Sequence, residues 1–154
     1  MKNNARVVVI GGGVVGVSTL YHLVKKGWTD CALIERKELT SGSTWHAAGL
    51  LPLFNMSYSV GQIHKYSVDL YGRLEEETGQ YAGLSRVSNI RLATTQDRMD
   101  EYKQYAGVAQ TIGVQVDILT PDEVVDIWPL AVKDNLIGAI RHPMDGYIQP
   151  ADLT

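Results

Sequence analysis

A glycine cluster near the start of the chain has the residue types and spacing to bind a dinucleotide. Residues 11 to 16 read Gly-Gly-Gly-Val-Val-Gly and fit the pattern G-x-G-x-x-G. The β-branched run Arg6 to Ile10 precedes the cluster and a helical pattern follows it, which is the context this motif requires. We expect Gly11 to permit the tight turn out of the strand, Gly13 to let a pyrophosphate approach the backbone, and Gly16 to allow close packing of helix on strand.

The groups beside the glycines extend the predicted site. The N–H groups of Val14 and Val15 lie at the start of the helix, where free donors and the helix dipole favour phosphate. Glu35 ends the second apolar run, close to the spacing of roughly 20 residues expected after the fingerprint. Its carboxylate can accept hydrogen bonds from ribose hydroxyls and would repel a 2′-phosphate. Arg36, the next residue, is also assigned to the predicted site. FAD and NAD both use this fingerprint, so it does not choose between them.

A second segment favours FAD over NAD. It reads Gly42-Ser43-Thr44-Trp45-His46-Ala47-Ala48-Gly49-Leu50. With the glycine motif before it, this segment resembles the D-amino-acid-oxidase-like superfamily of FAD-dependent oxidoreductases, and within it the dimethylglycine and sarcosine dehydrogenases. The resemblance implies a second set of contacts to FAD from the first three residues, and a backbone of small residues running close against the isoalloxazine ring. The residues assigned to FAD are Gly11, Gly13, Val14, Val15, Gly16, Glu35, Arg36, Ser43, Thr44, His46, Ala48, Gly49 and Leu50.

His46 is the candidate for covalent attachment of the flavin. The resemblance implies that a ring nitrogen of this histidine is bonded to the 8α-methyl carbon of the isoalloxazine. The chemistry is reasonable, because a neutral imidazole nitrogen is a competent nucleophile near pH 7. The alternative is a loop histidine that packs between Trp45 and the flavin without a bond.

The resemblance covers essentially the whole chain, including residues 70–79, 90–95 and 145–150. It implies oxidative N-demethylation of an amine, with formaldehyde released or captured by tetrahydrofolate in a separate C-terminal domain, and it leaves the electron acceptor unknown. Tyr147 and Gln149 stand where close relatives are expected to have His and Asp. If those positions contact substrate, the amine differs from dimethylglycine.

Two other functions remain open at this point. A non-catalytic regulatory homologue of the same fold exists in the pyruvate dehydrogenase phosphatase system, and Trp45-His46 weighs against that alternative. An NAD-dependent dehydrogenase would share the glycine fingerprint, and residues 42–49 weigh against it.

The elements that must position these residues follow from hydrophobic periodicity. The predicted strands are Arg6–Ile10, Cys31–Glu35, Asn89–Thr95, Val114–Leu119 and Leu136–Arg141. The predicted helices are Val14–Lys26, Ser59–Thr78, Gln96–Ile112 and a segment from Thr120 to the residue before Pro129. Residues 36–53 are predicted to be an extended loop or a broken short helix. Ile63, Tyr66, Leu70 and Leu74 would line the buried face of the second helix, and Asp152 would be the N-cap of a further one.

These elements predict an α/β fold: a Rossmann-like FAD-binding βαβ unit with part of an inserted substrate-domain sheet. Residues 1–154 would form the N-terminal part of an incomplete FAD-binding domain. Because later strands normally complete such a cofactor site, we expect this truncated chain to bind FAD poorly by itself.

Composition excludes several classes of protein. The 154 residues carry a net charge of −3 without a basic run, which argues against nucleic-acid binding. No apolar stretch approaches the roughly 18 residues of a membrane span. The strand pattern begins within about five residues, which leaves no room for a signal peptide and predicts a cytoplasmic protein.

The remaining cysteine and histidines are not expected to do chemistry. Cys31 is the single cysteine, so no disulfide can form within the chain, and we expect a small buried hydrophobic residue there. The four histidines and the acidic residues have no metal-ligand spacing. We expect His22 and His64 to lie partly buried or at the surface, and His142 to lie in a loop before Pro143 without a site role.

Overall fold

The computed structural model describes residues 4–154 and divides the chain into two compact units. Unit 1 contains the residues up to Gly49 together with Tyr81–Gly83 and Ile148–Thr154. Unit 2 contains Leu50–Gln80 and Leu84–Tyr147. The mixture of parallel and antiparallel strands with helices confirms the predicted α/β class.

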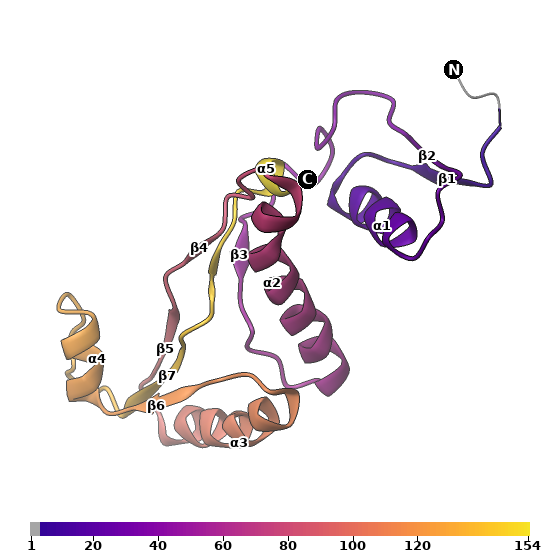
Figure 1. Cartoon of the computed structure of the whole chain (residues 1–154). Helices are drawn as coiled ribbons and strands as arrows, with labels where there is room; N and C mark the ends of the chain where they lie inside the picture. The colour runs from indigo at the N-terminus through magenta and orange to yellow at the C-terminus, as the bar shows by residue number, and fades with distance from the viewer. Residues whose placement is uncertain (1–3) are drawn as a thin grey trace. The chain divides into compact units, whose positions relative to one another are not determined.

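Unit 1 is built on a βαβ motif, drawn in indigo in Figure 1. Strand β1 (Val7–Ile10) and strand β2 (Cys31–Ile34) pair in parallel along their full length, and helix α1 (Val14–Lys25) connects them. Each bound of these three elements lies within one residue of the sequence prediction. Helix α5 (Pro150–Leu153) also belongs to this unit.

The apolar residues of the βαβ motif in unit 1 are only thinly covered. No residue of α1 is buried. On the sheet, the side chain of Ile10 is 85% exposed and that of Ile34 is 55% exposed. Cys31 is half-buried rather than buried as expected, and its Sγ lies 3.2 Å from the carbonyl oxygen of Trp28.

Unit 2 contains two antiparallel three-stranded sheets, with strand orders β3-β8-β4 and β5-β7-β6. The strands are β3 (Leu50–Leu51), β4 (Ser85–Arg86), β5 (Asn89–Ala93), β6 (Asp117–Leu119), β7 (Gly138–His142) and β8 (Gly146–Tyr147). The helices are α2 (Tyr58–Thr78), α3 (Gln96–Ile112) and α4 (Pro121–Ile127).

Strand β7 is covered on both faces. Neighbouring residues of a strand point in opposite directions, so each face of β7 packs against a different cluster. Ile140 is fully buried and joins a core cluster with Tyr105 and Ala109 of α3. Ala139, also fully buried, joins a second cluster with Val124 of α4. Figure 1 shows α3 and α4 beside this sheet. Unit 2 therefore has two packed clusters of buried residues, whereas α1 of unit 1 has no buried residue.

The ends of α3 and α4 follow from local chemistry. The side chain of Thr95 accepts a hydrogen bond from the N–H of Arg98 and begins α3, which ends at Gly113 with φ +75°. Thr120 and Glu123 form a reciprocal capping box at the start of α4. Caps of this kind satisfy N–H groups that have no partner inside the helix. The predicted bounds of α3 are confirmed, and α4 ends before Pro129 as expected.

The buried face of α2 differs from the prediction. Ile63 and Tyr66 are 65% and 50% exposed, whereas Gly61 and Val68 are buried and Leu70 is buried as expected. Gly61 packs closely against α3, because a Cβ there would lie 2.4 Å from Cδ1 of Ile112. The predicted face was based on the spacing of large apolar side chains, so it did not include Gly61.

Three further expectations are corrected. Strand β6 begins at Asp117, because Val114 turns into the core after α3 instead of joining the ladder. Helix α5 begins at Pro150, so Asp152 lies in its first turn and is not its N-cap. His142 lies in β7 opposite Asn89, not in a loop. The two-residue strands β3, β4 and β8 are too short for any periodicity to predict.

Candidate cofactor site

The glycine turn of unit 1 has the geometry that its sequence predicts. Gly11 has φ +110°, a conformation that L side chains rarely adopt. Gly16 faces the backbone of the same turn, because a Cβ at this position would lie 1.9 Å from the carbonyl oxygen of Gly11. Any side chain at residue 16 would therefore push α1 away from the turn. Both glycines are required by the backbone itself.

The first turn of α1 presents backbone donors. The N–H of Val17 donates to the carbonyl oxygen of Gly13 at 3.0 Å and closes the first helical turn. The N–H groups of Val15 and Gly16 come before that bond, so they have no intrahelical partner. The N–H of Val14 is directed instead at Oγ1 of Thr44, at 3.0 Å. Two of the N–H groups at the helix start thus stay available to a phosphate, and the third holds a loop.

Glu35 lies directly beside this turn. Its Oε2 accepts a hydrogen bond from the N–H of Gly12 at 2.7 Å, and its Oε1 accepts one from the N–H of Lys37 at 2.9 Å. These two bonds, the Gly12 bond first, hold the pKa of the carboxyl below its usual value. Each carboxylate oxygen has a further lone pair, so the ionised group can still accept from two hydroxyls.

The other residues assigned to FAD are placed less uniformly. Arg36, Ser43 and Ala48 are exposed. Gly49 has φ +71°, and its carbonyl oxygen accepts a hydrogen bond from the N–H of Ile148 at 2.8 Å. Leu50 belongs to unit 2, where it is 68% exposed in β3. The structure therefore gathers most of the predicted residues in unit 1 and leaves Leu50 in the other unit.

His46 lies in the loop after β2 with its ring exposed. Its Nδ1 is 3.1 Å from the carbonyl oxygen of Gly42, and its ring centroid is 4.0 Å from that of Trp45. A carbonyl oxygen can only accept, so a hydrogen bond at this distance assigns the ring proton to Nδ1. In the neutral imidazole the lone pair is then on Nε2.

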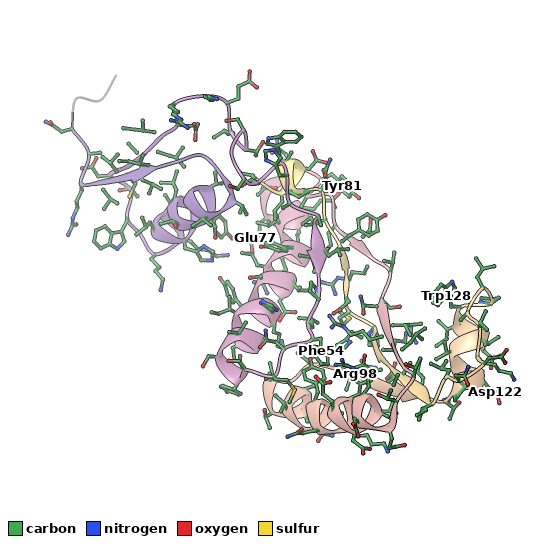
Figure 2. The ribbon with its side chains drawn as sticks, turned by 180° about the vertical axis from the view of Figure 1, so that it is seen from behind. Phe54, Glu77, Tyr81, Arg98, Asp122 and Trp128 are labelled. Carbon is green, nitrogen blue, oxygen red and sulfur yellow. The ribbon has the colours of Figure 1, made fainter. Side chains whose placement is uncertain are left out.

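Sequence reasoning missed a buried polar cluster in unit 2. The hydroxyl of Tyr105 donates to the carbonyl oxygen of Leu53 at 2.9 Å and lies 3.3 Å from Nε2 of His142. Oδ1 of Asp145 accepts from the N–H of Leu53 at 3.0 Å. The ring of Phe54, labelled in Figure 2, packs against Tyr105 with centroids 4.3 Å apart. The cluster thus fixes residues 53–54 against α3 and the end of β7.

Burial shapes the titration of this cluster. His142 is fully buried, and burial together with the nearby Arg91 lowers its pKa to about 4. Asp145 is 1% exposed, and burial raises its pKa to about 6. A His and an Asp three residues apart around a Pro were visible in the sequence, but their burial was not. Nothing in the local pattern distinguishes them from surface turn residues.

Residues 4–154 contain neither a metal-binding cluster nor a membrane-spanning helix. No group of three or more His, Cys, Asp or Glu among the described residues could hold a metal ion. Within the same part of the chain, no helix is long and apolar enough to cross a membrane.

Comparison with known protein families gives a match over nearly the whole chain. The family described as FAD dependent oxidoreductase (DAO) matches residues 6–154. The mitochondrial dimethylglycine dehydrogenase of Rattus norvegicus is 44% identical over 153 residues, which cover 99% of this chain and 18% of that protein. The mitochondrial sarcosine dehydrogenase of Homo sapiens is 40% identical over 152 residues, which cover 98% of this chain and 17% of that protein. The chain therefore spans about a fifth of the length of these relatives.

Two further similarities bear on function and fold. The mitochondrial pyruvate dehydrogenase phosphatase regulatory subunit of Mus musculus is 38% identical over 149 residues, which cover 97% of this chain and 17% of that protein. Among solved structures, L-proline dehydrogenase from P. horikoshii superposes with a TM-score of 0.88 at 27% sequence identity, covering 99% of this chain and 40% of that chain.

Proposed function

Because the chain belongs to the family of FAD-dependent oxidoreductases, we propose that it forms the N-terminal part of the FAD site of an enzyme that oxidises N-methylated amines. The observation that carries this proposal is the glycine turn of unit 1. Its backbone is closed by Gly16 against Gly11, and the N–H of Gly12 in the same turn holds the carboxylate of Glu35. Unit 2 would contribute part of the substrate domain. The family match argues against an NAD-dependent enzyme.

The residues present fit FAD. The N–H groups of Val15 and Gly16 would hold the pyrophosphate, where the start of α1 favours negative charge. The ionised Glu35 would accept hydrogen bonds from the ribose hydroxyls. When bound, FAD supplies the acceptor for the hydride that leaves an amine carbon, and the protein binds and orients both reactants.

The names of the relatives support the substrate class. Dimethylglycine and sarcosine are both small N-methyl amino acids, and the corresponding dehydrogenases are similar to this chain over nearly its full length. Loss of a hydride from an N-methyl carbon gives an iminium that water converts to amine and formaldehyde. Tyr147 and Gln149 stand where close relatives are expected to have His and Asp. If these two residues contact substrate, we expect them to give this protein a preference for an amine other than dimethylglycine. Use of tetrahydrofolate in a further domain is part of the same proposal.

His46 is the proposed point of flavin attachment, through Nε2. The contact from Nδ1 to Gly42 leaves Nε2 with the lone pair that a nucleophile needs. Nε2 of His46 would supply the electron pair for a bond to the 8α-methyl carbon, which would lose one proton. A bound flavin would take up the two electrons, and dioxygen would reoxidise it. A tethered cofactor would stay with the enzyme through turnover.

The proposal is tested on the complete polypeptide that the gene encodes, beside a His46→Ala variant and a His22→Ala control. His22 lies on α1 of the same unit, outside the loop. We expect a flavin-fluorescent band on a denaturing gel for the wild type and the control, and no such band for His46→Ala. Reduction of a dye by the wild type should then be driven by dimethylglycine or sarcosine and not by glycine.

Other outcomes would each correct one part of the proposal. A dark band with yellow colour released on denaturation would leave a flavoprotein without the covalent bond. Absence of flavin and of amine-dependent reduction would favour the second candidate, a regulatory homologue, which the similarity to the mouse regulatory subunit supports. The predicted cytoplasmic location stays a prediction. It contrasts with the mitochondrial relatives, and fractionation of the source cells would test it.

A further inference from the structure

We propose that Thr44 is a positioning residue that couples the phosphate-binding turn to the loop carrying His46, so that flavin attachment at His46 depends on the Thr44 hydroxyl. The inference rests on the proposed function, since it needs a flavin bound at this site. It concerns how the protein sets the position of the imidazole, and it gives the hydroxyl no direct part in the chemistry.

The hydroxyl of Thr44 occupies a place prepared for it in the glycine turn. The residue is buried, with 8% of its surface exposed, although both of its neighbours are exposed. Its Oγ1 accepts a hydrogen bond from the N–H of Val14 at 3.0 Å, across 30 residues of sequence. A Cβ at Gly13 would lie 2.8 Å from this oxygen. The missing side chain at residue 13 therefore makes room for Thr44 as well as for a phosphate.

A second contact holds the other end of the loop on the same turn. The N–H of Thr40 donates to the carbonyl oxygen of Gly12 at 2.9 Å. Thr40 has φ +66°, a conformation that is uncommon for a residue other than glycine and needs supporting contacts. Leu39 covers Gly12, where a Cβ would lie 2.6 Å from its Cδ2. Residues 39–44 are thus fixed at both ends.

His46 follows directly from this anchored segment. Its Nδ1 contacts the carbonyl oxygen of Gly42, two residues before Thr44. The N–H of Ala47 donates to the carbonyl oxygen of Thr44 at 3.1 Å and closes a turn around the histidine. The imidazole is therefore held on one side through its ring and on the other through the backbone of Thr44. Loss of the hydroxyl contact would release the turn that orients Nε2.

The hydrogen bond can be removed from either side. Thr44→Val keeps the shape of the side chain and removes the acceptor, whereas Thr44→Ser keeps the acceptor. Val14→Pro removes the donor at the first position of α1, which tolerates proline, and Gly13 before it has ψ 178°, as a residue preceding proline prefers. Ser41→Ala, at an exposed position of the same loop that is not among the residues assigned to FAD, is the matched control.

The measurement is the rate of covalent flavin incorporation after FAD is added to flavin-free complete polypeptide. We expect Thr44→Val and Val14→Pro each to slow attachment about 10-fold, and the double variant to be no slower than the slower single one. Thr44→Ser and Ser41→Ala should stay within about 3-fold of the wild type. In a His46→Ala background, Thr44→Val should weaken non-covalent FAD binding by a smaller factor than it slows attachment, because the hydroxyl acts mainly on the position of the imidazole.

The outcomes separate this inference from the proposed function. A wild type that never acquires covalent flavin overturns the assignment of His46 and this inference together. Attachment at the wild-type rate in Thr44→Val overturns this inference alone. A loss of FAD affinity as large as the loss of rate, or a Thr44→Ser variant as slow as Thr44→Val, would also overturn it, since either result would make Thr44 a structural residue.

Discussion

The contacts that stabilise unit 1 internally differ from those that stabilise unit 2. In unit 2, residues such as Ile140 and Val124 are fully buried and belong to two packed clusters around one sheet. In unit 1, no residue of α1 is buried, and Ile10 of β1 is 85% exposed. Unit 1, with fewer buried residues, is the unit that carries all of the predicted cofactor residues except Leu50.

The difference shows how the glycine turn of unit 1 can be well formed without a large core. Gly11, Gly16 and Thr44 are positioned by backbone sterics and by hydrogen bonds close to the turn. These contacts fix geometry, but they bury little apolar surface and so contribute little to the free energy of unfolding. Ligand binding should therefore stabilise unit 1 more than unit 2.

The largest expected effect comes from comparing two helical glycines. Gly16→Ala would force a Cβ into the carbonyl of Gly11, so FAD binding by the complete polypeptide should weaken by on the order of 100-fold or more. Gly107 lies on α3 in unit 2, where an added Cβ would meet nothing within 4 Å, so Gly107→Ala should stabilise by about 0.5–1 kcal/mol. Equilibrium FAD titration and urea unfolding check both values, and a tolerated Gly16→Ala would contradict the turn geometry.

Truncation of two isoleucines tests the contrast in burial. Ile140→Ala empties a fully buried position and should lower the free energy of unfolding by about 2–5 kcal/mol. Ile10→Ala removes a side chain that is 85% exposed and should change it by less than about 0.5 kcal/mol. Urea unfolding measures both. A large effect of Ile10→Ala would mean that other parts of the complete polypeptide cover β1.

Two carboxyl groups give the smallest effect, with opposite signs in the two units. The backbone hydrogen bonds in unit 1 lower the pKa of Glu35, whereas burial in unit 2 raises the pKa of Asp145 to about 6 from 3.8. A raised pKa favours the folded state most when the group is protonated. This contribution is complete below the unfolded pKa and is lost as the pH rises through about 6. Asp145→Asn removes that loss.

The pH profile of unfolding measures this effect. Relative to Asp145→Asn, the wild type should lose about 1–3 kcal/mol of stability between about pH 4 and pH 7. His142 acts in the other direction, because its pKa is lowered to about 4 and its contribution is lost as the pH falls from about 6.5 toward that value. Stability of Asp145→Asn should therefore rise with pH in this window more steeply than that of the wild type. Parallel profiles for the two proteins would show that Asp145 titrates normally.

Local pattern was sufficient for the elements with strong signals. The βαβ motif, the full extent of α3 and the end of α4 before Pro129 were predictable, because glycine turns, caps and periodicity are properties of neighbouring residues. The buried face of α2 was mispredicted, since Gly61 is buried only because Ile112 of another helix packs on it. The short strands β3, β4 and β8 exist only through pairing with one another.

The candidate site also has a part that was predictable from neighbouring residues and a part that depends on tertiary contacts. The sequence by itself determined the glycine fingerprint, Glu35 at its distance along the chain and the segment around His46, because these are fixed by residue type and spacing. Only the tertiary structure decided that Thr44 receives the N–H of Val14, and that Tyr105, His142 and Asp145 form one buried cluster around Leu53. These contacts join residues that are 30 or more positions apart, and a hydrogen bond of that kind exists only once the chain has brought its two partners together.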